Sequence, residues 1–319
     1  MKASVIISNL EPQGNLLTQL YALCTQDFPK DQYEIILPDL GNLTRAQYTI
    51  IGHLEQEHPH FRLLRGSGKN RSKMINAAAR QARSALLLFI ESHCIPPKDW
   101  VARAVRLFET HDIDAALGFV KTVPTHVPSA QVESKLLYDV YDRMERLGTK
   151  KSFFDFHNSA ITKACFDELG GFDEGLPMMM EFELGARLYK NKKRVHQFKE
   201  NEIWHNTDAT FRNYDRIIAG QGRDRGRMIQ RFGVQYMHDY FPMPRFLALL
   251  PLLRAFRIPA FMLASALTLT GGAGFHVAQR LRLGKRAAGF WFNLFAKNSL
   301  RRGILLGLKK SEAVVPRRR

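Results

Sequence analysis

Residues 85–93 read Ala85-Leu86-Leu87-Leu88-Phe89-Ile90-Glu91-Ser92-His93, and they indicate the class of fold. The first six residues are apolar without interruption, which is typical of a central strand that helices cover on both faces. Ligands of such sheets bind beyond the carboxyl ends of the strands. The polar residues at positions 91–93 are therefore the first candidates for a functional site.

The sequence before this stretch alternates short apolar runs with amphipathic ones. The expected strands are residues 3–8, 33–37 and 61–64, and the expected helices are residues 14–25, 46–57 and 71–83. This β-α-β-α-β order predicts an α/β fold whose sheet is doubly wound and mainly parallel, with helices on both faces. We expect this domain to extend over residues 1–240.

The positive charge of the chain is concentrated at its carboxyl end. The formal net charge of the whole chain is +17. Residues 245–319 contain 15 lysines and arginines but a single acidic residue, Glu312, so this segment alone carries +14. We therefore expect a second module, residues 241–319, that is helical and cationic and that binds an anionic partner.

Lipid headgroups are the partner that this module fits best. Residues 258–275 carry no charge, and their 18 residues reach only the lower limit for a membrane span. The aromatic residues at 289–295 lie between Lys285-Arg286 and Lys297, a pattern that suits the headgroup region of an anionic membrane. We expect interfacial or re-entrant helices; a helical subdomain with a solvated basic face is the alternative. Nucleic acid is not expected, because a duplex-binding surface does not need long apolar runs.

The cysteines and the amino terminus indicate the compartment. Cys24, Cys94 and Cys165 lie far apart and form no CxxC motif, which argues against a disulfide framework or a zinc knuckle and fits a reducing environment. The apolar run at residues 5–7 is too short for a signal peptide. Together with the cationic module, these features predict a protein at the cytoplasmic face of the cell membrane.

Several segments, in the same order along the chain, resemble the family 2 glycosyltransferases. They are residues 4–7, 26–29, 33–36, 68–78, 96–100, 170–174 and 183–188. The resemblance covers roughly the first two-thirds of the chain and implies a GT-A-type fold. It also implies transfer of a sugar, with inversion, from a nucleotide-sugar donor to a lipid-linked or polysaccharide acceptor.

The sequence departs from this family at three functional positions. Leu40 stands where a second aspartate usually follows Asp39, Glu91-Ser92-His93 replaces the Asp-x-Asp metal motif, and Met180-Glu181 replaces an acidic pair. These departures keep a second hypothesis open, in which the chain is a non-catalytic GT-A module. Such a module would bind a nucleotide sugar or a glycan and recruit a partner to the membrane.

The altered metal motif still offers ligands for a divalent cation. The resemblance implies that Glu91, His93 and His205 hold Mn²⁺ or Mg²⁺, and imidazole ligands suit Mn²⁺ better than Mg²⁺. The alternative is that Glu91 and His93 are polar residues that follow a strand and bind no metal.

The resemblance assigns the general base and the donor contacts to further residues. Glu181 takes the position of the base, and Glu183 points to another side of the same helix; both could instead be solvated charges. The residues expected at the donor are Asp39, Lys69, Arg223 and Arg225. A turn-forming role for Asp39 and a solvated basic surface for the other three remain open.

Overall fold

The structure is a computed structural model that describes residues 1–8, 15–66, 68, 70–122, 154–206, 211–240, 257–280 and 284–307. Contacts within the chain define two compact units. The first consists mainly of residues 1–208, and the second consists mainly of residues 209–319. The functional division between residues 1–240 and 241–319 stays a prediction.

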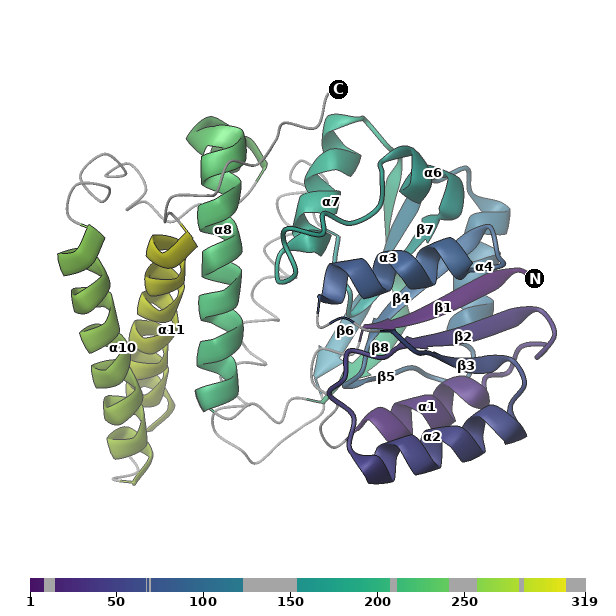
Figure 1. The fold of residues 1–319 in the computed structure, drawn as a ribbon, viewed down its shortest axis with the longest axis horizontal. Helices are drawn as coiled ribbons and strands as arrows, with labels where there is room; N and C mark the ends of the chain where they lie inside the picture. Colours follow the sequence, from purple (N-terminus) through teal and green to yellow (C-terminus); the bar gives the residue numbers. More distant parts are fainter. Residues whose placement is uncertain are drawn as a thin grey trace. The chain divides into compact units, whose positions relative to one another are not determined.

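The first unit is built on one sheet of eight strands in the order β3-β2-β1-β4-β7-β6-β8-β5 (Figure 1). The strands are β1 (Ala3–Ser8), β2 (Tyr33–Pro38), β3 (Phe61–Leu64), β4 (Leu86–Glu91), β5 (Cys94–Ile95), β6 (Ala115–Thr122), β7 (Asn158–Thr162) and β8 (Val195–His205). The expected α/β fold is confirmed. The first four strands are parallel, as expected from the helices that connect them.

The second half of the sheet is mixed rather than parallel. Strand β7 runs antiparallel to both β4 and β6, and β5 runs antiparallel to β8, whereas β6 and β8 are parallel. Because β7 runs against β4, its amino end lies beside the carboxyl end of β4, where Asn158 pairs with Ile90. Residues that precede β7 are thereby brought to the edge of the sheet that Glu91 occupies.

Helices cover both faces of this sheet (Figure 1). They are α1 (Leu16–Cys24), α2 (Arg45–Glu57), α3 (Arg71–Gln81), α4 (Trp100–Thr110), α6 (Lys163–Glu168) and α7 (Met180–Lys190). One buried cluster joins α1, α2 and α4 to the sheet, and a second joins α3, α6 and α7 to the opposite face. Along β4, Leu88 and Ile90 belong to the first cluster and Leu87 and Phe89 to the second, so both faces of this strand are buried, as its apolar sequence predicts.

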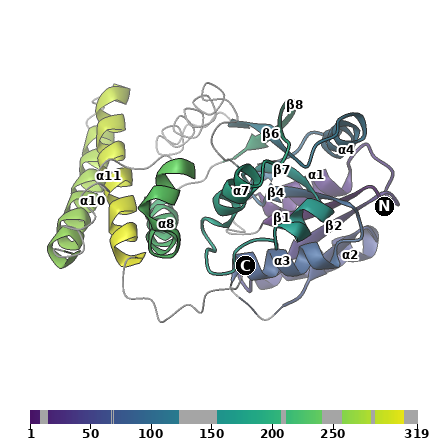
Figure 2. The same ribbon diagram turned by 90° about the horizontal axis from the view of Figure 1, so that it is seen from above.

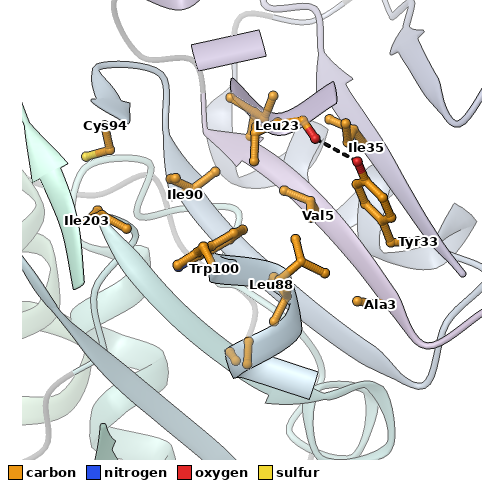
Figure 3. Packing of buried hydrophobic residues seen from close by; sticks show 14 of the residues in the cluster. Ala3, Val5, Leu23, Tyr33, Ile35, Leu88, Ile90, Cys94, Trp100 and Ile203 are labelled. Atoms are coloured by element: carbon orange, nitrogen blue, oxygen red, sulfur yellow. Dashed lines mark hydrogen bonds between the residues drawn. The ribbon is translucent and has the colours of Figure 1, made fainter. Parts of the chain in front are cut away.

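Polar side chains inside the first cluster are hydrogen-bonded. The Tyr33 hydroxyl donates to the Leu23 carbonyl at 2.8 Å (Figure 3). Trp100 is 1% exposed, and its indole N–H donates to Asn158 Oδ1 at 2.9 Å. These bonds satisfy groups that would otherwise be costly to bury, and they connect α1 and α4 to the sheet.

The second unit is helical. Its described helices are α8 (Phe211–Tyr240), α10 (Arg257–Arg280) and α11 (Gly284–Gly307), which lie alongside one another (Figure 2). A Cβ atom at Gly226 of α8 would lie 2.5 Å from the Ile304 carbonyl of α11, and one at Gly271 of α10 would lie 2.5 Å from the Phe295 amide nitrogen. The glycines therefore allow these helix backbones to pack in close contact.

The segment with the longest uncharged sequence forms part of α10. Within the described parts of the chain, no helix has both the length and the apolar composition that a membrane span requires.

Candidate functional site

The candidate site begins at the carboxyl edge of the two central strands. Glu91 ends β4 and is paired in register with Ser8, which ends β1. Glu91 is 8% exposed and Ser8 is fully buried. A buried carboxylate at this position requires charged or hydrogen-bonding partners.

Arg71 binds one oxygen of this carboxylate. Its Nη2 atom lies 2.5 Å from Glu91 Oε1, and its Nε atom donates to Ser8 Oγ at 2.7 Å. The guanidinium lies 4.8 Å from the ring centroid of Phe156, a cation–π contact. Arg71 is the first residue of α3, whose N-cap residue Asn70 accepts a hydrogen bond from the Lys73 amide through its side chain. The start of α3 thus fixes the position of this arginine.

Histidines surround the other oxygen. Glu91 Oε2 lies 3.2 Å from His93 Nε2 and 3.3 Å from His157 Nε2. His93 Nε2 in turn lies 2.8 Å from Nε2 of His205, the last residue of β8. Of the three residues that the resemblance implies as metal ligands, His93 therefore contacts each of the other two, Glu91 and His205.

Sequence reasoning did not identify His157. This residue lies directly before β7, and the antiparallel pairing of β7 with β4 places it beside Glu91. His157 Nδ1 lies 2.6 Å from Asp155 Oδ1, which also accepts the His157 backbone amide at 3.1 Å. The only sequence signal is the Asp-x-His spacing, and its meaning depends on a strand pairing that the sequence does not reveal.

The imidazoles differ in their affinity for protons. Burial disfavours a charged His93 and lowers its pKa to about 4, and burial also holds the pKa of His205 well below its usual range. For His157, burial acts in the same direction, but the carboxylates of Asp155 and Glu91 outweigh it and raise the pKa to about 9. Burial would raise the pKa of Glu91, yet His157, Arg71 and His93 together lower it. In the absence of a metal ion, Glu91 is therefore ionised, His93 and His205 are neutral, and His157 carries a proton that a metal ion would have to displace.

The donor atoms fit a divalent metal ion. Atoms of Glu91, His93 and His157 lie within 4.8 Å of one another, as do those of His93, Cys94 and His205. Cys94 is a poor ligand, because it is fully buried in the first hydrophobic cluster (Figure 3) and burial raises the pKa of its thiol. Neutral imidazoles and an ionised carboxylate are the forms that bind metals.

Glu181 lies in the first turn of α7 and is 5% exposed. Its Oε2 atom is buried and has no hydrogen-bond partner among the described residues. Burial raises the pKa of Glu181 to about 8; Arg71 opposes the shift, and Glu91 and Asp155 add to it. The carboxyl group of Glu181 thus interacts electrostatically with Arg71, Glu91 and Asp155. An uncompensated carboxyl group of this kind is a candidate general base.

Glu183 has a different role, as the helical spacing predicts. Arg187 Nε donates to Glu183 Oε1 at 2.8 Å, and the same arginine donates through Nη2 to the Gly171 carbonyl at 2.8 Å. The Asn76 side chain exchanges two hydrogen bonds of 2.8 Å with the Phe172 backbone. Glu183 therefore contributes, through Arg187, to holding the glycine-containing turn at residues 170–174 in place, and Asn76 contributes directly.

Asp39 directly follows β2 at the same edge of the sheet. Its Oδ1 atom accepts the Gly41 amide at 2.8 Å, and its Oδ2 atom accepts the Tyr48 hydroxyl at 2.7 Å. Strand β1 lies between β2 and β4 in the sheet. Because neighbouring strands are usually about 4.8 Å apart, the strand that precedes Asp39 and the strand that ends at Glu91 are separated by about 10 Å. The hydrogen bond to Gly41 agrees with a turn-forming role and leaves donor binding as a prediction.

The remaining donor residues expected from the sequence belong to the second unit or lie outside the described residues. Lys69 lies outside the described residues. Arg223 and Arg225 lie on α8 in the second unit. The side chain of Arg223 is exposed. Burial lowers the pKa of Arg225 to about 10. The Nε atom of Arg225 has no hydrogen-bond partner among the described residues. A donor-binding role for these residues stays a prediction.

Solved structures resemble the chain in fold. The mannosyltransferase PcManGT from Pyrobaculum calidifontis, in complex with GDP-Man and Mn²⁺, gives a TM-score of 0.61 at 17% identity, over 96% of this chain and 86% of that one. Residues 1–349 of S. aureus TarS, in complex with UDP-GlcNAc, give a TM-score of 0.54 at 14% identity, over 94% of this chain and 90% of that one. The chain therefore has the GT-A fold.

Sequence comparison identifies the family. The glycosyltransferase AglE of Haloferax volcanii is 26% identical over 182 residues, which is 54% of this chain. The alignment covers 56% of AglE, so the chain spans little more than half the length of this relative. The sequence profile of glycosyl transferase family 2 matches residues 4–170, which include β1, β4 and the residues around Glu91. With more than half of its length matched by this profile, the chain belongs to glycosyl transferase family 2.

Proposed function

We propose that the protein transfers a sugar from a nucleotide-sugar donor to an acceptor hydroxyl, with inversion at the anomeric carbon. The observation that carries the proposal is Glu181, a buried carboxyl group whose Oε2 atom has no hydrogen-bond partner among the described residues and which interacts electrostatically with Glu91 and Asp155. A site that holds a donor diphosphate and a nearby base provides the two groups that this reaction needs.

The donor would bind along the carboxyl edge of the sheet. Asp39 is suited to accept hydrogen bonds from the nucleoside, and Glu91 with its neighbouring histidines would face the diphosphate. A divalent cation, Mn²⁺ or Mg²⁺, held by Glu91, His93 and His205 would neutralise the charge of the departing nucleoside diphosphate. The solved relatives that bind GDP-Man with Mn²⁺, or UDP-GlcNAc, support a donor of this class.

Glu181 would accept the proton of the attacking hydroxyl. Its pKa of about 8 lies close to neutral pH, where a general base combines a useful ionised fraction with a strong driving force for proton transfer. Glu183 cannot share this task, because its carboxylate binds Arg187. Attack by the hydroxyl on the face opposite the leaving group inverts the anomeric configuration.

The second unit would bind the protein to an anionic membrane. On α10, the exposed residues with described side chains are all uncharged: Met262, Leu263, Ala266, Leu269, Thr270, Ala273 and Val277. Leu269 is 74% exposed and Met262 is 66% exposed. The outer face of a solvated helix normally carries charges, so this uncharged face is suited to the interfacial region of a bilayer, and the surrounding +14 charge favours anionic lipid.

Attachment at the cytoplasmic face of the cell membrane would bring the site close to lipid-linked acceptors. We therefore propose an acceptor of the lipid-linked or polysaccharide class. The uncharged face of α10 favours this location over a purely soluble one.

Incubation of the purified full-length protein with Mn²⁺ and a panel of nucleotide sugars tests the proposed activity. Release of nucleoside diphosphate, slow with water and faster with a lipid-linked acceptor, is the expected result. Donor binding without any release would contradict the enzyme and would support the non-catalytic GT-A module. Glu181→Gln serves as the negative control, because it retains the shape of the side chain and removes the base.

A further inference from the structure

His157 presents a ring nitrogen to the same carboxylate oxygen that faces His93. His157 Nε2 lies 3.3 Å from Glu91 Oε2, and His93 Nε2 lies 3.2 Å from it. We infer that His157 is an additional metal ligand, so that Glu91 and three histidines form a site that prefers a borderline transition metal to Mg²⁺. This inference rests on the proposed metal role of Glu91 and His93, and it adds a residue and a metal preference to that role.

The donor atoms of Glu91, His93 and His157 lie within 4.8 Å of one another and suit one coordination shell, and His205 contacts this group at His93. Metal–nitrogen bonds of about 2.0–2.1 Å in a tetrahedral shell separate neighbouring ligand atoms by about 3.3 Å. The separations of 3.2 and 3.3 Å from Glu91 Oε2 match this value, whereas the 2.8 Å between the Nε2 atoms of His93 and His205 is shorter, so His205 would have to move to join the same shell. The three rings also lie close together, with centroids 4.5 to 5.7 Å apart.

Asp155 holds His157 in the orientation that a ligand needs. The 2.6 Å contact between His157 Nδ1 and Asp155 Oδ1 directs Nε2 toward Glu91. A carboxylate that accepts the other ring N–H is the usual support of a metal-binding histidine, because it fixes the tautomer and raises the basicity of the ligand. Asp155 is therefore a positioning residue of this site.

The same atoms disfavour Mg²⁺. Mg²⁺ requires nearly octahedral oxygen ligands, but Arg71 occupies Glu91 Oε1 and leaves one oxygen of this carboxylate free for a metal. The other available atoms are imidazole nitrogens, which suit Mn²⁺, Co²⁺ and Zn²⁺ far better. A competing role for His157 is that of a permanent cation that remains paired with Glu91 and Asp155 and excludes a metal from its ring.

Titration of the purified full-length protein with Co²⁺, Mn²⁺ and Mg²⁺, in the absence of donor, tests the inference. We expect Co²⁺ and Mn²⁺ to bind more tightly than Mg²⁺. His157→Ala should weaken Co²⁺ binding by about tenfold or more and alter the visible spectrum of bound Co²⁺, and Asp155→Asn should weaken it by about 10–100-fold. The control is His53→Ala, which removes an exposed imidazole on α2 and should leave Co²⁺ binding unchanged.

A His157→Ala protein that binds Co²⁺ with the affinity and the spectrum of the wild type would overturn the inference. Equal losses of Co²⁺ and Mg²⁺ affinity would overturn the proposed preference. Pulsed electron paramagnetic resonance of the Mn²⁺-loaded wild type counts coupled imidazole nitrogens and needs no folded variant; three imidazoles support the inference and two overturn it. These measurements require no sugar transfer, so a protein that binds metal in this way but releases no nucleotide would contradict only the proposed function.

Discussion

Arg71 Nη2 lies 2.5 Å from Glu91 Oε1, and this ion pair leaves Oε2 as the carboxylate oxygen that faces His93 and His157. Both partners are buried. The arginine partly neutralises the carboxylate, and in the proposed metal site it would limit how many metal bonds Glu91 can make. Stability and metal binding would then be coupled through this one contact.

Arg71→Met is expected to destabilise the protein and to make its stability depend on metal. Loss of one partner of a buried ion pair usually costs about 3–5 kcal/mol, and here it leaves Glu91 without its arginine. Mn²⁺ should recover part of this loss in thermal unfolding experiments. The control is Arg65→Met, which removes an exposed ion pair to Glu55, an interaction usually worth about 0–1 kcal/mol. Equal melting temperatures for the two variants would contradict the prediction.

Glu181→Gln and Glu183→Gln should affect different properties although they are two residues apart. The first removes the proposed base and should reduce turnover by about two to four orders of magnitude while donor binding stays nearly intact. The second weakens the contact with Arg187, which supports the turn at residues 170–174, and should lower the melting temperature. Steady-state kinetics, calorimetric donor titration and thermal unfolding separate the two effects. Unchanged turnover in Glu181→Gln would exclude Glu181 as the base.

The raised pKa of Glu181 gives activity and stability opposite dependences on pH. In the folded protein the pKa rises from 4.5 to about 8 because the group is buried. Between these values the folded state retains a proton that the unfolded state has released. Stability therefore falls as pH increases through this window, by at most about 1.4 kcal/mol per pH unit.

Turnover should instead rise toward pH 8, because the base must be ionised. Chemical denaturation from pH 5 to 9 is expected to show that Glu181→Gln lacks this loss and exceeds the wild type in stability most clearly near pH 8. Parallel stability curves for the two proteins would contradict a raised pKa of Glu181.

Asp39→Asn tests whether this carboxylate binds the nucleoside or only forms the turn. If it binds the donor, the substitution should raise the donor dissociation constant by about tenfold, equivalent to about 1.4 kcal/mol. Tyr48→Phe removes the hydroxyl that binds Asp39 Oδ2 and should leave donor affinity intact. Calorimetric titration with a nucleoside diphosphate measures both. A turn-forming role alone would leave both affinities unchanged and reduce only the stability of the Asp39 variant.

The sequence was sufficient to predict the parallel half of the sheet and the position of Glu91. The continuous apolar run of β4 and the helical spacing around it identify a central strand. A residue at the carboxyl end of such a strand lies at the edge of the sheet where ligands of this class of fold bind. The different surroundings of Glu181 and Glu183 also followed from helical periodicity, since residues two apart face different sides of a helix.

The antiparallel half of the site could not be predicted in this way. His157 and Asp155 reach Glu91 only because β7 pairs with β4 in the opposite direction, and no local pattern reveals the partner or direction of a strand. The role of Arg71 was missed for a similar reason. A basic residue near the start of an amphipathic helix is normally solvated, and its burial here depends on Glu91, Ser8 and Phe156.

The last prediction concerns the uncharged face of α10. Leu269 and Met262 are among its most exposed residues, and burial of such a side chain in a bilayer contributes about 1.5–3 kcal/mol. Replacement of either by Asp should therefore reduce binding to anionic liposomes by about tenfold or more. The control is Tyr21→Asp on α1, which changes an apolar residue of similar exposure, 64%, in the first unit and should leave binding unchanged.

Sedimentation with liposomes rich in anionic lipid measures this binding. High salt should weaken binding of the wild type, because screening reduces the attraction between the cationic segment and the headgroups. It should leave the difference between the wild type and Leu269→Asp in place, since that difference arises from apolar burial. A wild-type protein that remains in the supernatant at low salt would refute the membrane proposal. Equal effects of Tyr21→Asp and Leu269→Asp would show instead that α10 is not the docking face.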